Sequence, residues 1–128
     1  MIRLKKVQRP NPLDVNAERK YYVSAKTAGE ISLEELSENI ADRCTLTEAD
    51  VLATLSALQR EMTRNLMSGR IVRFGSFGSF QLSLNSSGVE NADDASLSQV
   101  KGVRVRFRPG TRIQENLRNL KFTLAAEQ

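Results

Sequence analysis

The sequence predicts an α+β fold in which helices pack on one face of an antiparallel sheet. Beyond a short N-terminal extension, two segments with helical apolar spacing come first, then two strand segments, a polar arm, a third strand segment and a last helix. Helices and strands do not alternate as β-α-β, which is the order that a parallel sheet requires. A chain of 128 residues is long enough for one domain, or for one domain with an appendage.

Residues 1–31 form the extension. Alternating residues at Ile2–Lys5 and Tyr21–Lys26 predict short strands, and the Pro-Asn-Pro run at Pro10–Pro12 predicts a loop between them. Two interpretations remain open at this point. The extension is either a pair of edge strands or an unstructured leader, or it is a basic arm that contacts phosphate.

Two helices are expected next, and both begin at recognisable caps. Ser32-Leu-Glu-Glu35 is a capping box, so a helix is predicted over residues 33–43. Thr47 opens a second helix over residues 48–68, and Gly69 supplies its left-handed C-terminal stop. Apolar residues recur on one face of this second helix at Val51, Leu52, Leu55, Leu58, Met62 and Leu66.

The second helix is long for so small a core. At a rise of about 1.5 Å per residue it extends roughly 30 Å. A second copy of the same helix would cover its apolar stripe better than the rest of one chain, so the sequence favours a dimer.

The first strand segments lie between residues 70 and 85. Arg70–Phe74 leads through Gly75 and Gly78 into an alternating segment. The two glycines predict a bend between strands at a place where only glycine fits. Alternation places Phe80, Leu82 and Leu84 on one face of the second strand, and Gln81, Ser83 and Asn85 on the other.

The remaining segments are an arm, a strand and a helix. Residues 85–101 are polar and acidic and predict a long excursion or hairpin arm. Gly102–Arg108 alternates again, Pro109-Gly110 ends the strand, and a last helix of about ten residues follows. In this third strand Val103, Val105 and Phe107 are expected to point inward, and Arg104, Arg106 and Arg108 outward.

Charge is segregated along the chain. Residues 1–31 carry a net charge of +4 from seven Lys or Arg and three acids, and residues 102–128 carry +4 from six and two. Residues 32–68 carry −4 from three and seven. Basic ends around an acidic middle suggest a polyanionic partner that touches only part of the surface.

The strongest single signal is the run of arginines at alternate positions of the third strand. Arg104, Arg106 and Arg108 share one face, and Arg112 follows the turn. One interpretation is a solvent-exposed outer face of the sheet. The other is a polyanion surface, because three arginines with no interleaved acid repel one another unless an anion lies nearby, and arginine suits phosphate oxygens.

Several classes of function are disfavoured. The chain has no histidine, which excludes Ser-His-Asp and Cys-His catalysis and every histidine-based metal site. Cys44 is the only cysteine, and we expect a small buried residue near a helix end. No stretch reaches the roughly 18 apolar residues of a membrane span, and Met1–Lys6 lacks the apolar core of a secretory signal. We therefore expect no enzyme activity, cofactor, metal site, small-molecule substrate or membrane partner.

A resemblance to a known family rests on two separated motifs. Val72-Arg-Phe-Gly-Ser-Phe-Gly-Ser-Phe80 is followed, after the polar arm, by Phe107-Arg-Pro-Gly110. With the two preceding helices, this pattern resembles the bacterial HU and IHF histone-like proteins over about residues 32–121. Residues 1–31 resemble the amino-terminal extension of HU-like proteins found in Bacteroidetes, and residues 122–128 are left as a C-terminal tail.

The resemblance implies an intertwined homodimer in which helices form the body, sheets form a saddle for double-stranded DNA, and two β-arms reach around the duplex. Binding of this kind is mostly to phosphates and the minor groove, has little sequence preference and bends DNA. It implies a nucleoid-associated protein of the bacterial cytoplasm that acts in DNA condensation. The residues expected to contact DNA are Arg73, Lys101, Arg104, Arg106, Arg108 and Arg112. The residues expected in the dimer core are Leu55, Leu58, Met62, Phe77, Phe80 and Phe107.

The arm departs from the family's pattern, in which a proline at each arm tip wedges between base steps. Residues 85–101 contain no proline, hold Lys101 as their only basic residue, and include the acids Glu90, Asp93 and Asp94. We therefore expect proline intercalation to be reduced or absent. The alternative function is an HU-fold structural or protein-interaction module that has lost DNA binding, and the acidic arm favours it.

Overall fold

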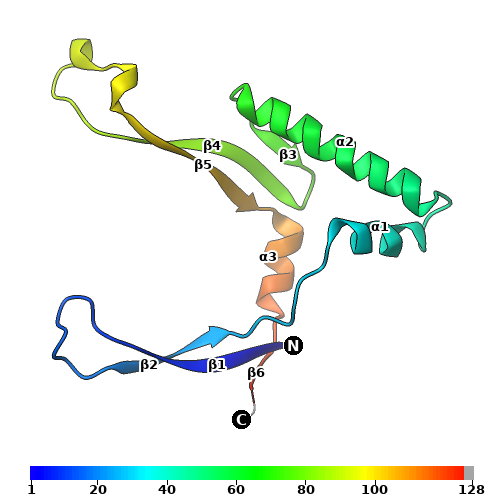
Figure 1. Ribbon diagram of the computed structural model, residues 1–128, viewed down its shortest axis with the longest axis horizontal. Coiled ribbons are helices and arrows are strands. Elements are labelled where there is room, and N and C mark those ends of the chain that lie inside the picture. Colours follow the sequence, from blue (N-terminus) through cyan, green and yellow to red (C-terminus); the bar gives the residue numbers. More distant parts are fainter. Residues whose placement is uncertain (126–128) are drawn as a thin grey trace. The chain divides into compact units, whose positions relative to one another are not determined.

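The computed structural model describes residues 1–125 (Figure 1). These residues separate into two compact units, Leu33–Asn116 and Met1–Ser32 together with the chain from Leu117 onward. Three α-helices accompany two three-stranded sheets in this part of the chain, which confirms the predicted α+β class. None of the helices described is long and apolar enough to cross a membrane.

The helical pair begins where the sequence predicts it. Helix α1 spans Leu33–Ala41 and helix α2 spans Glu48–Met67. The hydroxyl oxygen of Thr47 caps α2 by accepting a hydrogen bond from the backbone N–H of Asp50 at 3.2 Å. At the other end Gly69 has a φ of 84°, the left-handed geometry that the predicted stop requires.

The turn between the two helices corrects one expectation. Cys44 is exposed, so the prediction that it is a buried residue is wrong. Its backbone N–H donates to the carbonyl of Ala41 at 3.2 Å, in a turn that remains at the surface. The small residue that α1 does bury is Ser37, whose hydroxyl donates to the carbonyl of Leu33 at 2.8 Å.

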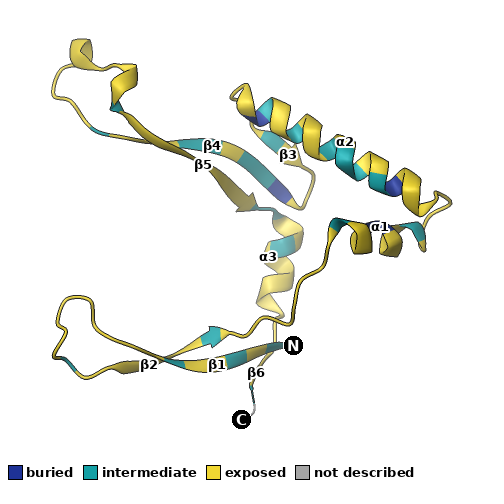
Figure 2. Ribbon diagram, in the orientation of Figure 1, coloured by how far each residue is buried: buried dark blue, intermediate teal, exposed yellow. Residues whose placement is uncertain are grey.

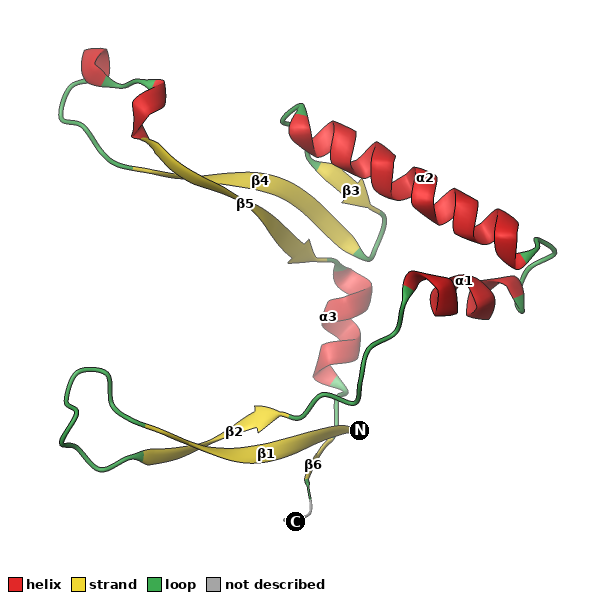
Figure 3. Cartoon of the chain, in the orientation of Figure 1, coloured by secondary structure: helices red, strands yellow, loops and turns green. Residues whose placement is uncertain are grey.

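The same unit contains an antiparallel sheet in the order β3-β4-β5 (Figure 3). Strand β3 spans Val72–Phe74, β4 spans Gly78–Ser86 and β5 spans Val100–Pro109. Between β4 and β5 the chain makes the predicted excursion, which contains two short 3₁₀ helices, η1 (Ala92–Asp94) and η2 (Leu97–Gln99). Strand β3 begins at Val72, two residues later than Arg70, where the sequence predicted its start.

Two glycines bring the two sequence motifs into contact. The backbone N–H of Gly110 donates to the carbonyl of Phe77 at 2.8 Å. A Cβ on Gly110 would collide with the carbonyl of Ser76, and a Cβ on Gly78 would collide with the facing backbone of β5. The bend predicted from the glycines is confirmed, and it lies against the Pro-Gly turn from which helix α3 (Thr111–Arg118) begins.

The two ends of the chain form the second sheet, in the order β2-β1-β6. Strands β1 (Ile2–Arg9) and β2 (Lys20–Ala25) are antiparallel, and β6 (Phe122–Leu124) runs parallel to β1. The segment expected as a tail, residues 122–128, thus begins with a strand. Its last residues, 126–128, lie outside the described part of the chain.

Few apolar side chains are buried within the described residues (Figure 2). Val51 and Leu66 of α2 are the buried hydrophobic residues, at 4% and 8% exposure. The rest of the α2 stripe, including Leu55, Leu58 and Met62, is half-buried. Most of the predicted apolar faces are therefore only partly covered within one chain.

Candidate nucleic-acid interface

Strand register gathers four of the predicted arginines on one face of the β3-β4-β5 sheet. Ser79 of β4 pairs with Arg73 of β3 on one side and with Arg108 of β5 on the other. Residues directly opposite one another in a sheet share a face, so these three side chains lie in one row. The register adds two more opposed pairs, and the resulting arginine face consists of Arg73, Ser79, Gln81, Ser83, Arg104, Arg106 and Arg108.

Shallow hollows lie along the arginine face. One, of about 290 Å³, is lined in part by Arg73, Arg106 and Arg108. A second, of about 190 Å³, includes Arg73 and Arg108, and a third, of about 270 Å³, is lined by Ser83, Arg104 and Arg106. Each hollow offers at least two guanidinium groups, whose planar donor forks match the oxygens of a phosphate.

The arginine face is electrostatically uncompensated. It contains no acidic residue, and its four arginines are exposed. Within residues 1–125 none of these arginines takes part in an ion pair. Arginine remains charged at any physiological pH, so the face carries four like charges beside hydroxyl and amide groups that also donate hydrogen bonds.

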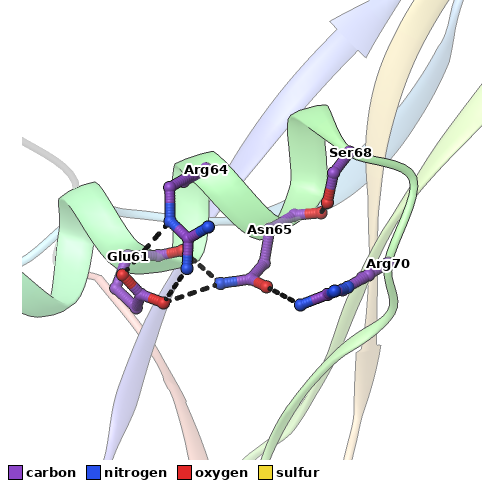
Figure 4. Close-up of polar contacts among 5 residues, drawn as sticks. All are labelled: Glu61, Arg64, Asn65, Ser68 and Arg70. Carbon is purple, nitrogen blue, oxygen red and sulfur yellow. Dashed lines mark hydrogen bonds and ion pairs between the residues drawn. The ribbon is translucent and has the colours of Figure 1, made fainter.

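The end of α2 shows the opposite arrangement (Figure 4). Arg64 Nη2 lies 2.5 Å from Glu61 Oε1, and Asn65 Nδ2 donates to the same oxygen at 3.1 Å. Asn65 Oδ1 accepts a hydrogen bond from Arg70 Nη1 at 3.0 Å, and Ser68 Oγ donates to the Asn65 carbonyl at 2.8 Å. The hydrogen bonds from Arg64 and then Asn65, together with the charge of Arg64, lower the pKa of Glu61. Arg64 and Arg70 are therefore engaged within the chain.

Two predicted DNA-contacting residues are not placed on the arginine face by the register. The β4-β5 ladder passes from Gly102 to Val100 through a bulge that leaves Lys101 without an opposed residue. Arg112 belongs to α3 rather than to the sheet, and its backbone N–H donates to the carbonyl of Ser76 at 3.3 Å. Both side chains are exposed, and their contact with DNA stays a prediction.

The other face of this sheet is apolar and carries the aromatic residues of the predicted dimer core. Phe80 and Phe107 are opposed, with ring centroids 4.9 Å apart, and Phe77 lies 5.5 Å from Phe107. Phe74 meets Phe77 edge to face at 5.8 Å. Phe77 and Phe107 remain 45% and 42% exposed, so the rings pack against one another but are not fully covered within one chain.

Sequence reasoning missed the neutral members of the arginine face. Gln81 and Ser83 were placed on the polar side of their strand, but no role was assigned to them. Ser79 was not singled out, although it lies between two arginines. The signal that finds all three is the pairing register between β3, β4 and β5, which is a long-range property of the fold.

Sequence comparison identifies the family. Residues 1–124 match HU-HIG, described as an HU domain fused to wHTH, Ig, or Glycine-rich motif. The protein belongs to this family. The resemblance to HU-like proteins is thus confirmed, and the match includes the N-terminal extension as well as the two motifs. A search of the curated proteins with this sequence found no match.

A solved structure shares the fold of this HU-HIG protein. It is the crystal structure of a protein from Bacteroides vulgatus ATCC 8482, named for a suggested role in bacterial DNA binding. The two structures superpose with a TM-score of 0.67 at 12% sequence identity, over 99% of this chain and 49% of the other. The chain therefore spans about half the length of that protein.

Proposed function

We propose that this HU-HIG protein binds double-stranded DNA through the arginine face, with little sequence preference, as an architectural component of the bacterial nucleoid. Arg73, Arg104, Arg106 and Arg108 contact phosphate oxygens and reach toward the minor groove. Lys101 and Arg112 add phosphate contacts outside the face. The family match and the structural neighbour's suggested role support DNA as the partner.

The observation that carries this proposal is the acid-free row of arginines across three strands. The arginine face offers side-chain donors and, within the described residues, no ion pair to satisfy its guanidinium groups. A duplex supplies phosphates at regular spacing along such a surface, and phosphate contacts give affinity without reading sequence. The proposal includes no proline wedge, because residues 85–101 contain no proline.

A homodimer is part of the same proposal. The half-buried stripe of α2, with Leu55, Leu58 and Met62, and the open phenylalanine cluster are apolar surfaces that one chain does not cover. Covering apolar surface is favourable by about 25 cal/mol per Å². A second copy offers the same surfaces in a symmetric arrangement, which is how most soluble oligomers close.

The test is fluorescence anisotropy of a labelled random-sequence duplex, titrated with the protein at several salt concentrations. If about six phosphates are neutralised per dimer, the log-log salt slope is near −5. Arg106→Gln should remove one contact per copy, which reduces the magnitude of that slope by about 2 and weakens binding equally on every sequence. Arg60→Gln, which removes the same charge from the exposed surface of α2, is the matched control and should bind like the parent protein.

The alternative is an HU-fold protein-interaction module without DNA binding. The observation that favours it is the excursion between β4 and β5, which presents Glu90, Asp93 and Asp94 and a 92% exposed Leu97. Such a surface suits a protein partner better than a phosphate backbone. Absence of duplex binding by the parent protein at low salt, where a basic face binds best, would decide for this alternative.

A further inference from the structure

The register of the β2-β1-β6 sheet creates a second basic face in the unit formed by the chain ends. Arg9 pairs with Lys20, and Lys5 lies on the same face of β1 because strand residues two apart point to the same side. The Lys26 backbone N–H donates to the Arg3 carbonyl at 2.7 Å, which continues the β1-β2 ladder by one residue. We call the exposed set that results the terminal basic face: Arg3, Lys5, Arg9, Lys20 and Lys26.

The terminal basic face has no acidic neighbour in its sheet. Strands β1, β2 and β6 contain no Asp or Glu, and the acids of residues 1–31 lie in connecting segments at Asp14, Glu18 and Glu30. Within residues 1–125 no ion pair engages any of its five cations. Five like charges on two short strands repel one another, and a bound polyanion removes that cost.

The opposite face of the same sheet is mainly apolar, with Lys6 as its one cation. The register places Ile2 and Leu4 of β1 beside Phe122 and Leu124 of β6, and Val23 of β2 lies on the same side. Phe122, Leu124 and Val23 are 57%, 56% and 60% exposed. A flat membrane cannot meet the cations and this apolar face at the same time, because the two groups point in opposite directions. The charge pattern therefore favours a polyanion over an anionic bilayer.

The spacing of the cations suits a nucleic-acid backbone. Alternate residues of a strand are about 6.8 Å apart, which equals the rise of two phosphates along the helix axis on one strand of a duplex, at about 3.4 Å each. Tyr22 is the one aromatic residue on the terminal basic face, opposite Val7 and half exposed. Binding to single strands uses several stacking aromatics in succession, so this face is suited to the phosphates of a duplex.

We propose that the terminal basic face is a second surface for duplex DNA phosphates, distinct from the arginine face. It rests on the proposed function only in taking DNA as the partner, since its residues belong to the other unit of the chain. In an HU-HIG protein with both surfaces, the chain ends add phosphate contacts to those of the arginine face.

Neighbouring lysines of β1 provide the test. Lys5 lies on the terminal basic face and Lys6 on the opposite face of the same strand, so Lys5→Gln and Lys6→Gln remove the same charge from adjacent positions. Each variant of the full chain is titrated against a labelled 30-base-pair duplex across a salt series. Lys5→Gln should reduce the magnitude of the log-log salt slope by about 1 per contacting copy and weaken binding roughly fivefold to tenfold at about 0.1 M salt. Lys6→Gln should stay within about twofold of the parent protein.

A triple variant separates this proposal from the proposed function. Arg3→Gln/Lys5→Gln/Arg9→Gln is compared with Arg104→Gln/Arg106→Gln/Arg108→Gln, and circular dichroism and thermal unfolding confirm that both are folded. If both surfaces bind DNA, each triple variant should weaken duplex binding. A variant that carries all six substitutions should lose more affinity than either triple variant. Equal binding by Lys5→Gln, Lys6→Gln and the parent protein overturns the second surface and leaves the arginine face intact. The reverse pattern, in which only the terminal triple variant loses binding, overturns the arginine face instead.

The same proteins are mixed with phosphatidylserine-containing vesicles and with a single-stranded oligonucleotide. Preference for the duplex, with the Lys5→Gln effect present on it, supports the proposal. Tighter binding to vesicles or to the single strand, with the Lys5→Gln effect confined to that ligand, overturns it in favour of that ligand.

Discussion

The two sheets of this HU-HIG protein each present a basic face, but different contacts hold the two sheets together. Each has three strands, and each gathers most of its cations on one face and its apolar residues on the other. The β3-β4-β5 sheet is antiparallel throughout and is fixed by close glycine contacts and a phenylalanine cluster. The β2-β1-β6 sheet is completed by a parallel strand from the far end of the chain and has no aromatic cluster of that kind among the described residues.

This difference shows that alternation alone creates a basic face, whereas tertiary contacts decide how firmly the face is held. In β5 the arginines alternate without interruption, so the face is visible in one strand. In β1 the cations at Arg3, Lys5 and Arg9 are interrupted by Val7 on the same side. There the face emerges only when the register with β2 adds Lys20.

The largest effect is expected where the β3-β4-β5 sheet is held most tightly. Gly110→Ala places a Cβ against the carbonyl of Ser76, backbone that cannot move aside without breaking the Gly110–Phe77 hydrogen bond. We expect a loss of about 3 kcal/mol or more in the free energy of unfolding, measured by denaturant titration. Gly102→Ala, in open space on β5, is the control and should change it by about 1 kcal/mol at most. Equal stability of the two variants would show that the glycine contact does not hold this sheet.

A smaller effect is expected from two variants that each add one charge to a different face of the β3-β4-β5 sheet. Val105→Lys places an ammonium group on the apolar face, and Ser83→Lys places one on the arginine face. Val105 is 52% exposed in the single chain, so its replacement is tolerated unless a second copy covers it. We expect Val105→Lys to dissociate the dimer in sedimentation equilibrium, at a cost of about 1–3 kcal/mol per buried unpaired polar group.

Ser83→Lys is the companion measurement on the same sheet. It should leave the dimer intact and strengthen duplex binding, raising the magnitude of the salt slope by about 1 per copy. A dimer that survives Val105→Lys unchanged would place the subunit contact elsewhere on the molecule.

Local patterns were enough to predict most of the secondary structure. The cap at Thr47 and the stop at Gly69 are each fixed by interactions within a few residues, so propensity and spacing reveal them. The bend at Gly75 and Gly78 is revealed by the positive φ that glycine readily adopts, although contacts with β5 and Gly110 hold it in place. The alternation of β4 and β5 likewise gave the correct partition of residues between the two faces. It did so because the period of two is a property of the strand itself.

Long-range contacts account for what the sequence did not reveal. Strand β6 pairs with β1 from more than 110 positions away, which no local pattern of Phe122–Leu124 announces. The bulge that sets Lys101 aside depends on how β4 and β5 meet. Cys44 was expected inside because small apolar residues usually are, but the turn that contains it stays at the surface. The grouping of Arg73 with Arg108 also needed the register across three strands.

The smallest effect tests whether an unpaired charge is what distinguishes the basic faces of the two sheets from the end of α2. Arg64→Gln removes the ion pair with Glu61, so the pKa of Glu61 should rise toward its ordinary value in a carboxyl-detected NMR titration. Because that pKa is lowered in the folded protein, the stabilisation by the pair is present above the unfolded pKa and is lost as pH falls through the folded one. The pair is exposed, so the change in stability should be slight. Duplex binding should stay within about twofold of the parent protein, because Arg64 makes no phosphate contact in the proposed interface. A loss of DNA affinity as large as that of Arg106→Gln would mean that pairing within the chain does not decide which arginines meet DNA.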